Sequence, residues 1–413
     1  MDGENLYRGD ALMSRLRLDH SLPAVLVLDG NQRSALAVVR SLGRRGVPVV
    51  VGEATARSLA GASRYCWRRI RYPSPLIDPE GFVTEVSRVV REYGMQVLPV
   101  TDITTAIVLK HRSLFGEQVL PFPAWEDYER LTNKCSLARH AGSLGVLTPA
   151  TLCIQNRDEL PAVVDQIRFP AVVKAAYSKV WVRDTWVATS VQYVYSREDL
   201  FAAVAQLPWH GQAPILIQQC VVGEGQGVFA LFDHGRPLVW FAHRRVREKP
   251  PSGGVSVLSE SISLPQQMLE SARTLLTSVG WHGVAMVEFK VSQDGRPYLI
   301  EVNGRFWGSL QLAVDSGADF PYLLYRLAIG QQVEPVTEFS IGRKCRWLLG
   351  DLDRLYLIIK GKQAGGMTTK LKAVAEFLRF REPGMRYEVN RLDDMKPFLF
   401  ELGNYIRAIA KFG

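Results

Sequence analysis

The stretch GVAMVEFKVSQDGRPYLIEVNGRF, residues 283–306, is the clearest structural signal in the sequence, because it predicts a β-hairpin. Apolar and polar residues alternate on both sides of Asp294-Gly295, a pair that is favoured in two-residue type I′ turns. We therefore expect two antiparallel strands, over 283–291 and 297–303. A loop made of these two residues alone determines which residues face each other across the hairpin.

The expected register places two carboxylates opposite each other, because Glu288 faces Glu301. Asn303 and Arg305 continue the same face of the second strand. The other face is apolar and consists of Val287, Phe289, Ile300 and Val302. Facing carboxylates repel by about 0.2–1 kcal/mol, and by more when they are buried. Solvation of this face, neutralisation by Lys290 and Arg305, or a bound divalent cation such as Mg²⁺ would each remove the repulsion.

The first ~120 residues predict an α/β domain. An apolar run at 23–30 is followed by a helical pattern, then by a β-branched run at 47–53, a helical pattern at 81–94 and a strand pattern at 95–102. Strands that alternate with helices indicate a doubly wound parallel sheet. The first strand ends at a single glycine rather than at G-x-G-x-x-G, so we predict no dinucleotide binding. Such a sheet still binds ligands beyond the carboxyl ends of its strands.

A second region begins near Pro121 and mixes helices with antiparallel strands. We expect a helix over 134–144, a short buried strand over 169–178 and successive antiparallel strands over 213–246. Gly223–Gly227 is expected to form a turn between two of those strands. These patterns predict an α+β arrangement after the parallel domain.

Composition and charge narrow the class of protein. The chain has 413 residues, of which 47% are hydrophobic and 22% charged, as is typical of a globular protein of two or three domains. It has no apolar stretch long enough to span a membrane and no signal-peptide core, so we expect a cytoplasmic protein. The net charge of +9 is concentrated after Ile341, where fifteen Lys/Arg and eight Asp/Glu give +7. A segment of this kind is either a solvated face or a site for an anionic substrate or membrane surface, and no nucleic-acid motif accompanies it.

The five cysteines are far apart in the sequence and predict neither a zinc site nor a disulfide framework. They are Cys66, Cys135, Cys153, Cys220 and Cys345, without a C-x-x-C pair. We therefore expect all five to be reduced.

Glu288 and the motif E-x-N-x-R at 301–305, preceded by Lys134 and Lys174, resemble the ATP-grasp superfamily. The resemblance is strongest to the carboxylate–amine ligases and their carbamoyl-phosphate-synthase-like relatives. It covers residues ~20–335, and its specificity lies in the ordered set rather than in any single residue.

The resemblance implies a fold of three parts. An N-terminal Rossmann-like domain would span 1–120, an ATP-grasp domain of two α+β subdomains 121–340, and a basic helical extension 341–413. The small subdomain would cover about 145–215 and the large one about 216–340.

The resemblance also implies that ATP and Mg²⁺, for which Mn²⁺ could substitute, bind between the two subdomains. The residues expected at the phosphates are Lys134, Lys174 and Ser178. Adenine would be held by the backbone of Gln219, Cys220 and Val221, and the ribose by Glu224. The metal would be held by Glu288, Glu301 and Asn303. The reacting groups would be contacted by Arg305, Arg245 and Arg247.

Each of these assignments has a purely structural alternative. Lys134 can be an exposed lysine on a helix. The segment 221–227 can be a plain turn, and the segment 243–261 can be a flexible basic loop. Lys174 is different, since a lysine in the apolar run PAVVKAA needs an anionic partner or a route to water. One departure from the family concerns 175–190. Many ATP-grasp proteins have a glycine-rich flap there, whereas this stretch has two tryptophans and no glycine.

The predicted activity is ATP-dependent joining of a carboxylate to an amine through an acyl phosphate. Activation of bicarbonate uses the same machinery and is the first alternative. The second is a non-catalytic nucleotide-binding module that interacts through its basic C-terminal segment. The expected partners are a small carboxylate and an amine, without nucleic acid, and a homodimer is compatible with this. Asn31 and Arg33, which follow the first strand, are candidates for the acceptor site.

Overall fold

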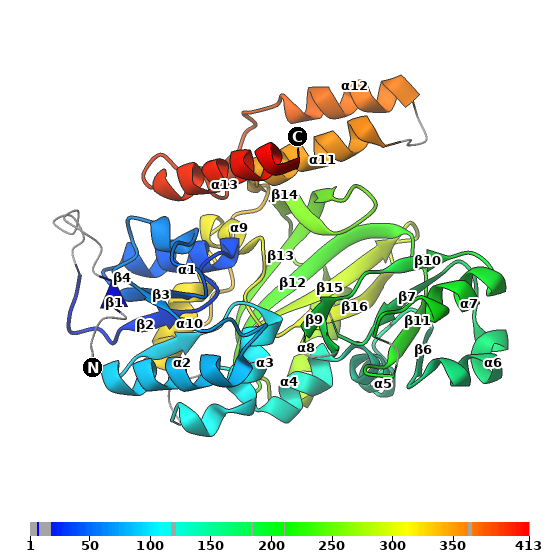
Figure 1. Ribbon diagram of the computed structural model, residues 1–413, viewed down its shortest axis with the longest axis horizontal. Helices are drawn as coiled ribbons and strands as arrows, with labels where there is room; N and C mark the ends of the chain where they lie inside the picture. Colours follow the sequence, from blue (N-terminus) through cyan, green and yellow to red (C-terminus); the bar gives the residue numbers. More distant parts are fainter. Residues whose placement is uncertain are drawn as a thin grey trace.

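The computed structural model of the chain describes residues 6–7, 18–116, 121–177, 179–182, 185–209, 211–361 and 366–412. Ser178, one of the expected phosphate contacts, lies outside these ranges. Within them, a five-stranded, a four-stranded and a seven-stranded sheet are arranged along the molecule with helices packed around them (Figure 1).

The N-terminal sheet has the strand order β1-β4-β3-β2-β5 and confirms the predicted doubly wound parallel architecture. Its β2 to β5 run parallel, and β1 pairs antiparallel with β4. The elements are β1 (Leu6–Tyr7), β2 (Val25–Val27), α1 (Arg33–Gly43), β3 (Val49–Glu53), β4 (Arg68–Arg71), α2 (Pro79–Tyr93), β5 (Gln96–Leu98) and α3 (Asp102–Lys110). Val25 and Val27 share a core with α1, whereas Leu26 and Leu28 share one with α2 and α3. Helices therefore cover both faces, which explains the uninterrupted apolar run of β2.

A four-stranded antiparallel sheet, β10-β7-β11-β6, follows along the chain. The elements of this region are α4 (Trp125–Thr132), α5 (Lys134–Ser143), β6 (Thr151–Ile154), α6 (Leu160–Val163), β7 (Ala171–Ala175), β8 (Lys179–Val182), β9 (Thr185–Ala188), β10 (Gln192–Val194), α7 (Arg197–Ala205) and β11 (Ile215–Gln219). The helix predicted over 134–144 is confirmed as α5, and the chain leaves it through Gly145, whose φ is +72°. The glycine-free stretch is the separate β8–β9 hairpin.

The largest sheet has the order β16-β15-β12-β13-β14-β17-β18. Its elements and helices are β12 (Gly223–Asp233), β13 (Arg236–Lys249), β14 (Val255–Ser261), α8 (Gln266–Ser278), β15 (Gly283–Ser292), β16 (Pro297–Asn303), α9 (Leu310–Asp315), α10 (Phe320–Ala328), β17 (Lys344–Arg346) and β18 (Met385–Tyr387). Neighbouring strands are antiparallel except β17 and β18, which are parallel.

The turn of the β15–β16 hairpin differs from the predicted two-residue loop. The Ser292 amide donates a hydrogen bond to the Arg296 carbonyl oxygen at 3.0 Å, which leaves residues 293–295 in the loop. The last of them, Gly295, has a φ of +81°, as expected for the end of a three-residue loop. The predicted type I′ turn is therefore wrong by one residue.

A β-bulge in β16 restores the predicted register beyond the turn. Phe289 pairs with Leu299, but Glu288 pairs with Glu301, so Ile300 has no partner on β15. The predicted pairing of two carboxylates is therefore confirmed. Ile300, which we expected in the apolar layer, is partly exposed, and Leu299 is buried in its place.

The turn predicted at Gly223–Gly227 is wrong, because these residues begin β12. Gly223 pairs with Ser292 and Gly227 pairs with Glu288. A Cβ atom on Gly223 would lie 2.1 Å from the Val291 carbonyl oxygen. Close packing of strands, rather than a turn, explains the glycines here.

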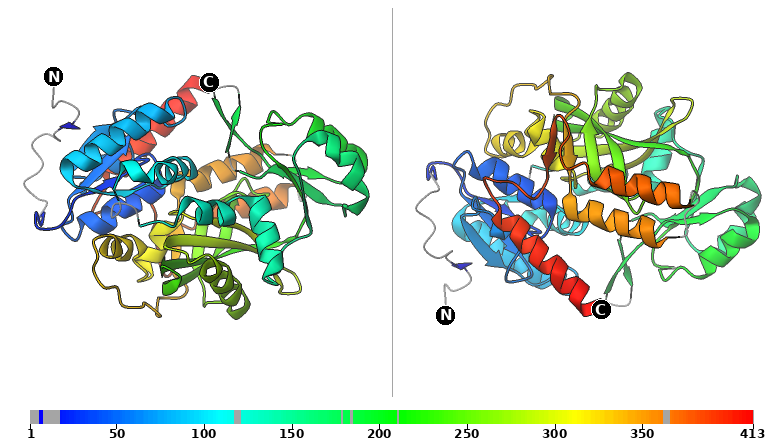
Figure 2. Two further views of the ribbon diagram at one scale, coloured as in Figure 1. Left: turned by 90° about the horizontal axis from the view of Figure 1, so that it is seen from below. Right: turned by 90° about the horizontal axis from the view of Figure 1, so that it is seen from above.

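The C-terminal segment adds β17 and β18 to the large sheet. Helices α11 (Leu348–Lys360) and α12 (Gly366–Phe377) lie between these two strands in the sequence, and α13 (Lys396–Phe412) follows β18. These helices lie over one side of the molecule, where the view from above shows all of them (Figure 2). A buried ion pair joins this segment to α1, because Arg40 Nε donates to Asp394 Oδ2 at 2.9 Å. In the part of the chain that is described, no helix is long and apolar enough to cross a membrane.

The expectation of reduced cysteines is wrong for two of them. Cys135 and Cys153, 18 positions apart, form a disulfide bond. The bond forms because α5 packs beside β6 and brings the two side chains together. Cys66, Cys220 and Cys345 are free.

Candidate functional site

A cluster of buried charges lies where β15 and β16 meet α5 and β7. Lys134 Nζ lies 3.3 Å from Oε2 of Glu301, and Arg245 Nη2 lies 2.5 Å from Oε2 of Glu288. Lys174 is close enough for both carboxylates to influence its pKa. The fold thus brings together residues from four separate parts of the sequence.

Lys134 is held in this cluster by the way α5 begins. Asn133 caps the helix, because its side-chain oxygen accepts from the amides of Cys135 and Ser136 at 3.0 and 3.1 Å. The Lys134 amide donates to the Ala176 carbonyl oxygen at 3.1 Å, which ties the helix end to the end of β7. The side chain is mostly buried, so the alternative of an exposed helix lysine is wrong.

Lys174 is a buried lysine in the middle of β7. Its Nζ donates to Gln218 Oε1 at 3.0 Å, and Gln218 Nε2 donates in turn to Thr151 Oγ1 at 2.8 Å. Burial, reinforced by the charge of Lys134, lowers the pKa of Lys174 to about 8. Its charge is therefore easily lost above neutral pH unless an anion lies beside it.

The facing carboxylates differ in their tendency to ionise. Burial raises the pKa of Glu288, in spite of the opposing effect of Arg245. Burial also acts against ionisation of Glu301, but Lys134 and Lys174 outweigh it and lower the pKa of Glu301 to about 2. A divalent cation beside the pair would favour the ionised form of both acids.

Neutralisation by Lys290 and Arg305 is one of the alternatives that the sequence leaves open for the facing acids, but neither side chain forms an ion pair with them. Lys290 Nζ donates to the Gly223 carbonyl oxygen at 3.3 Å. Arg305 instead pairs with Asp102, which lies next to the N-terminal sheet. The charges that oppose the two acids are those of Lys134, Lys174 and Arg245.

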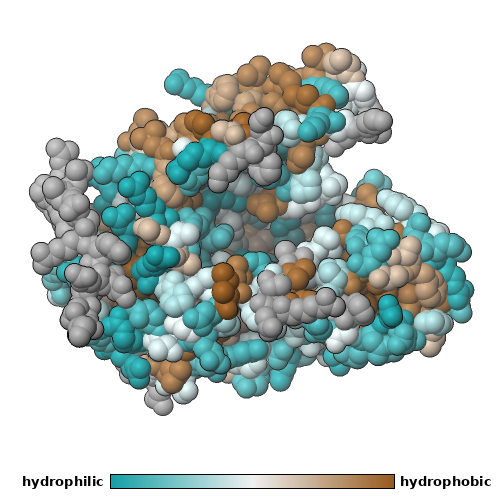
Figure 3. All heavy atoms as spheres, viewed as in Figure 1, coloured by the Kyte–Doolittle hydropathy of each residue, from teal (hydrophilic) through white to brown (hydrophobic). Residues whose placement is uncertain are grey.

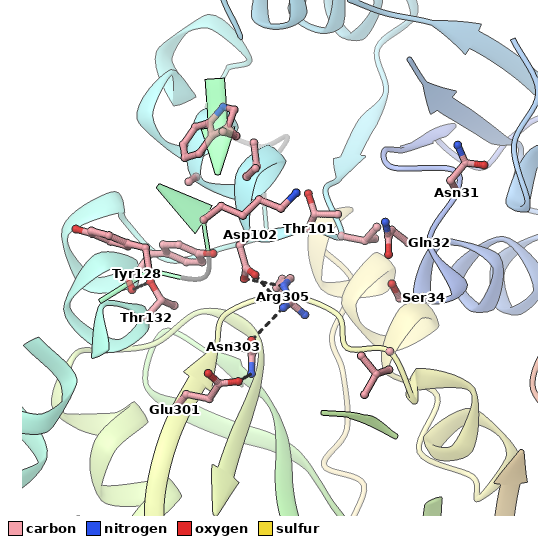
Figure 4. Close-up of a pocket in the computed structure, with 18 of the residues that line it drawn as sticks. Asn31, Gln32, Ser34, Thr101, Asp102, Tyr128, Thr132, Glu301, Asn303 and Arg305 are labelled. Atoms are coloured by element: carbon pink, nitrogen blue, oxygen red, sulfur yellow. Dashed lines mark hydrogen bonds and ion pairs between the residues drawn. The ribbon is translucent and has the colours of Figure 1, made fainter. Parts of the chain in front are cut away.

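Arg305 is fixed by hydrogen bonds on two sides (Figure 4). Its Nε and Nη2 donate to the two carboxylate oxygens of Asp102 at 2.7 and 3.0 Å, and Nη2 also donates to Asn303 Oδ1 at 3.0 Å. Asn303 Nδ2 donates to Glu301 Oε1 at 3.2 Å. Burial alone would lower the pKa of Arg305, but Asp102 outweighs it and raises the pKa above its usual range.

Asp102 is the important site residue that the sequence analysis missed. It is the first residue of α3 and directly follows β5, so it lies at the carboxyl end of a parallel strand. Polar residues at that edge are where doubly wound sheets bind ligands. The position of Asp102 at the end of the predicted strand 95–102 was the available signal.

A cavity of about 1000 Å³ lies in front of Arg305 and Glu301, and the surface is hollowed below the C-terminal helices (Figure 3). Of the expected site residues, the lining contains Lys134, Glu301, Asn303 and Arg305. It also contains Asn31 and Arg33, the acceptor-site candidates.

Aromatic side chains form much of the cavity wall, and they come from distant parts of the chain. The β8–β9 hairpin contributes Trp181 and Trp186, whose rings meet edge to face with centroids 5.3 Å apart. The C-terminal segment contributes Trp347 and Phe400. The flap without glycines is therefore a hairpin that covers the cavity with tryptophan.

The stretch 243–261 is not a loop, because it forms the β13–β14 hairpin. A β-bulge separates Arg245 from Arg247. Arg245 points to Glu288, whereas Arg247 pairs with Asp351 of α11 at 2.8 Å and donates to the Glu376 carbonyl oxygen at 2.9 Å. The structure therefore places Arg247 outside the charge cluster.

The residues expected around the nucleoside lie outside the cavity lining. Gln219 ends β11, Cys220 and Val221 connect it to β12, and Glu224 is the second residue of β12. The amides of Gln219 and Cys220 already donate to the carbonyl oxygens of Ala150 and Pro170 at 2.9 and 3.0 Å. Within the described residues the Val221 amide has no such acceptor.

Comparison with known proteins agrees with this geometry. Residues 213–349 match the family model described as ATP-grasp in the biosynthetic pathway with Ter operon. No curated protein sequence matches the chain. The family match is confined to residues 213–349, and together with the sheet topology it indicates an ATP-grasp fold.

Solved structures with the same fold include several ATP-grasp enzymes. The L-amino acid ligase from Bacillus licheniformis is 18% identical, with a TM-score of 0.63 over 78% of this chain and 79% of that one. An N5-carboxyaminoimidazole ribonucleotide synthetase, solved with ADP, is 12% identical, with a TM-score of 0.63 over 87% and 97%. The biotin carboxylase domain of the Hydrogenobacter thermophilus 2-oxoglutarate carboxylase, solved with MgADP and bicarbonate, is 14% identical, with a TM-score of 0.62 over 79% and 74%.

Proposed function

We propose that this protein is an ATP-dependent carboxylate–amine ligase that forms an amide bond through an acyl phosphate, with ADP and phosphate as products. The observation that carries the proposal is the buried Glu288–Glu301 pair, which faces lysine and arginine side chains at the edge of a large cavity. The cations suit phosphate oxygens, and the carboxylates suit a divalent metal. The shared fold with an L-amino acid ligase supports the same class of reaction.

Glu288, Glu301 and Asn303 fit a Mg²⁺ ion, or Mn²⁺ in its place. Carboxylate and amide oxygens are the hard ligands that these ions prefer. Burial raises the pKa of Glu288, and a divalent cation beside this acid would favour its ionised form. The metal would neutralise phosphate charge during transfer.

The nucleotide would extend from the β11–β12 connection towards the charge cluster. Lys134 and Lys174 would bind its phosphates, and Ser178 keeps the supporting role proposed from the sequence. Since the Gln219 and Cys220 amides are occupied, the Val221 amide is the donor available to adenine. Glu224 forms an ion pair with Arg244 at 3.6 Å, and it would exchange this contact for hydrogen bonds to the ribose hydroxyls.

Arg305 would stabilise the transferred phosphoryl group. A carboxylate oxygen of the substrate bonds to the γ-phosphorus while the bond to ADP breaks. The amine nitrogen then bonds to the acyl carbon, the bond to phosphate breaks and the nitrogen loses a proton. Because Asp102 and Asn303 already orient the guanidinium, little reorganisation is needed as charge develops. Arg245 would act indirectly, by positioning Glu288.

The cavity favours two organic substrates over bicarbonate. Its volume of about 1000 Å³ is at the upper end of the range for small-molecule sites, and bicarbonate would leave most of it empty. Its aromatic lining consists of Trp125, Tyr128, Tyr177, Trp181, Trp186, Trp347 and Phe400. We therefore expect at least one substrate to carry an apolar body.

ADP release with a panel of amino acids, other carboxylates and amines tests this function. Release that requires both a carboxylate and an amine supports the ligase, and hydroxylamine in place of the amine should trap the acyl phosphate as a hydroxamate. Release stimulated by bicarbonate without an amine would instead favour the carboxylase alternative. Tight ATP binding without turnover on the whole panel would favour the non-catalytic module.

The protein is placed in the cytoplasm, because its reaction consumes ATP.

The sheets support the proposed domain boundaries to different extents. The five-stranded sheet supports a boundary near residue 120, because none of its described strands lies beyond β5. A boundary near residue 340 is less sharp, because β17 and β18 extend the large sheet past it.

Nucleotide binding is expected to weaken as the pH rises above about 8. Burial lowers the pKa of Lys174 to about 8, so its ammonium is charged below that pH and is lost above it. Bound phosphate favours the charged form, and the affinity for ADP should therefore fall by up to about tenfold per pH unit above the pKa. Calorimetric titration of ADP across this range measures the slope.

Lys174→Arg provides the control for that titration. Arginine stays protonated throughout, so this variant should bind ADP with nearly constant affinity. Equal slopes in the variant and the wild type would assign the pH dependence to another group.

A further inference from the structure

The C-terminal helices expose an unusual amount of apolar surface. Of 25 large hydrophobic residues exposed in the described part of the chain, eleven lie between Tyr356 and Ile409. The space-filling view shows an apolar area over the C-terminal helices, at the top of the molecule (Figure 3). Apolar side chains gathered in this way indicate an interaction surface rather than random exposure.

Helix α12 turns its apolar side outward. Met367, Leu371, Val374 and Leu378 follow one another at helical spacing, and Met367 and Leu371 are 70% and 62% exposed. Ala373 is the one residue of this helix, all of which is described, that is buried. The helix is therefore amphipathic without a partner for its apolar stripe.

Helix α13 separates the cavity from this surface. Phe400, Glu401 and Asn404 line the cavity on one side of the helix. Leu399, Ile406 and Ile409 lie on the opposite side and are 61%, 57% and 59% exposed. Two helices thus present apolar stripes to the outside.

Most of the charges that remain unpaired around these stripes are basic. Seven acids of this segment pair with basic side chains, either in the body of the protein or within the segment itself; they are Asp351, Asp353, Glu376, Glu382, Glu388, Asp393 and Asp394. The eighth acid, Glu401, lines the cavity and accepts from Trp347 Nε1 at 2.8 Å. Within the described residues, several bases have no acidic partner; they are Lys360, Lys370, Lys372, Arg379, Arg381, Lys396 and Arg407. The excess positive charge of the segment is therefore available at its surface.

We propose that the face formed by α11, α12 and α13 binds the surface of an anionic lipid bilayer. Exposed apolar stripes would enter the region between headgroups and acyl chains, and the free bases would meet the lipid phosphates. Pairing of two copies through this face is disfavoured, because it would bring the same unpaired cations against each other. The proposal does not rest on the ligase activity, and either can fail without the other.

Flotation of the full chain with vesicles tests the proposal. Wild-type protein should bind vesicles that contain phosphatidylglycerol at least tenfold more tightly than pure phosphatidylcholine vesicles, and added salt should weaken binding. One lysine near an anionic surface contributes about 1 kcal/mol, or about fivefold in affinity, so Lys370→Glu with Lys372→Glu should weaken binding by at least about 25-fold. Leu371→Ser with Ile406→Ser should weaken it by about tenfold or more.

Arg236→Glu with Arg273→Glu is the matched control, because it makes the same charge change at exposed positions on another part of the surface. This variant should keep its vesicle affinity within about threefold. The proposal is overturned if wild-type protein does not distinguish the two vesicles, or if the control loses as much affinity as the lysine variant. It is also overturned if light scattering shows a wild-type dimer that Leu371→Ser with Ile406→Ser dissociates.

Discussion

Glu301→Gln is expected to lower the rate of ADP release by about 10²–10³-fold, a loss typical for one key electrostatic group in an active site. Glutamine keeps the shape of the side chain but removes its charge. With a pKa of about 2, the wild-type carboxylate is ionised at every working pH. The carboxylate lies 3.3 Å from Lys134 Nζ and would also bind the metal. Its loss would therefore weaken phosphate binding in two ways, through a displaced lysine and through a weakly bound metal. A coupled assay of ADP release at saturating substrates measures the effect.

Asp294→Asn is the matched control for this variant. It removes one carboxylate from the same hairpin, but at its exposed loop, and should leave the rate within about twofold. A second measurement avoids dependence on turnover. Mg²⁺ should tighten ADP binding to the wild type and have little effect on the affinity of Glu301→Gln. Wild-type rates in the Glu301→Gln variant would remove Glu301 from the proposed site.

The β15–β16 hairpin shows how far local sequence signals can be trusted. Alternation and Asp-Gly predicted both strands and the Glu288–Glu301 pair. They did not distinguish a two-residue turn from a three-residue loop followed by a bulge, because both satisfy the same pattern. The pairing survived the error because burial of Val287 and Val302 fixes the register more strongly than the turn does.

Contacts between distant segments could not be predicted in the same way. Asp102 and Arg305 are 203 positions apart, and no local pattern of either residue indicates the other. The same holds for Arg247, which a bulge and the position of α11 place beside Asp351. Such pairs depend on how whole domains pack, whereas Glu288 and Glu301 depend on one turn.

The nucleoside site illustrates a different limit of the sequence. The resemblance assigned the backbone of Gln219, Cys220 and Val221 to adenine, but which of these amides are free depends on the neighbouring segments. Hydrogen bonds to Ala150 and Pro170 occupy two of them. A resemblance can therefore place a segment near a ligand before it can assign the donors.

Asp394→Ala is expected to lower the free energy of unfolding by about 3–5 kcal/mol, the usual effect of breaking a buried ion pair. Arg40 would keep its charge while almost fully buried, without the carboxylate that accepts from its Nε at 2.9 Å. The Ser63 hydroxyl and the Arg64 amide, which donate to the same carboxylate at 2.7 and 2.9 Å, would also lose their acceptor. Denaturant unfolding followed by circular dichroism measures the change.

Asp393→Ala is the control, since this neighbour pairs with Arg44 at 2.5 Å while both side chains are about one third to one half exposed. An exposed pair contributes at most about 1 kcal/mol, so this variant should be nearly as stable as the wild type. Arg40→Met added to Asp394→Ala should recover part of the loss, because no unpaired charge is then buried. Recovery should be incomplete, since Arg40 also donates to the Glu388 carbonyl oxygen at 2.8 Å. If Asp394→Ala is no less stable than Asp393→Ala, burial of the ion pair is not what holds the C-terminal segment, and the cavity wall that it carries, against α1.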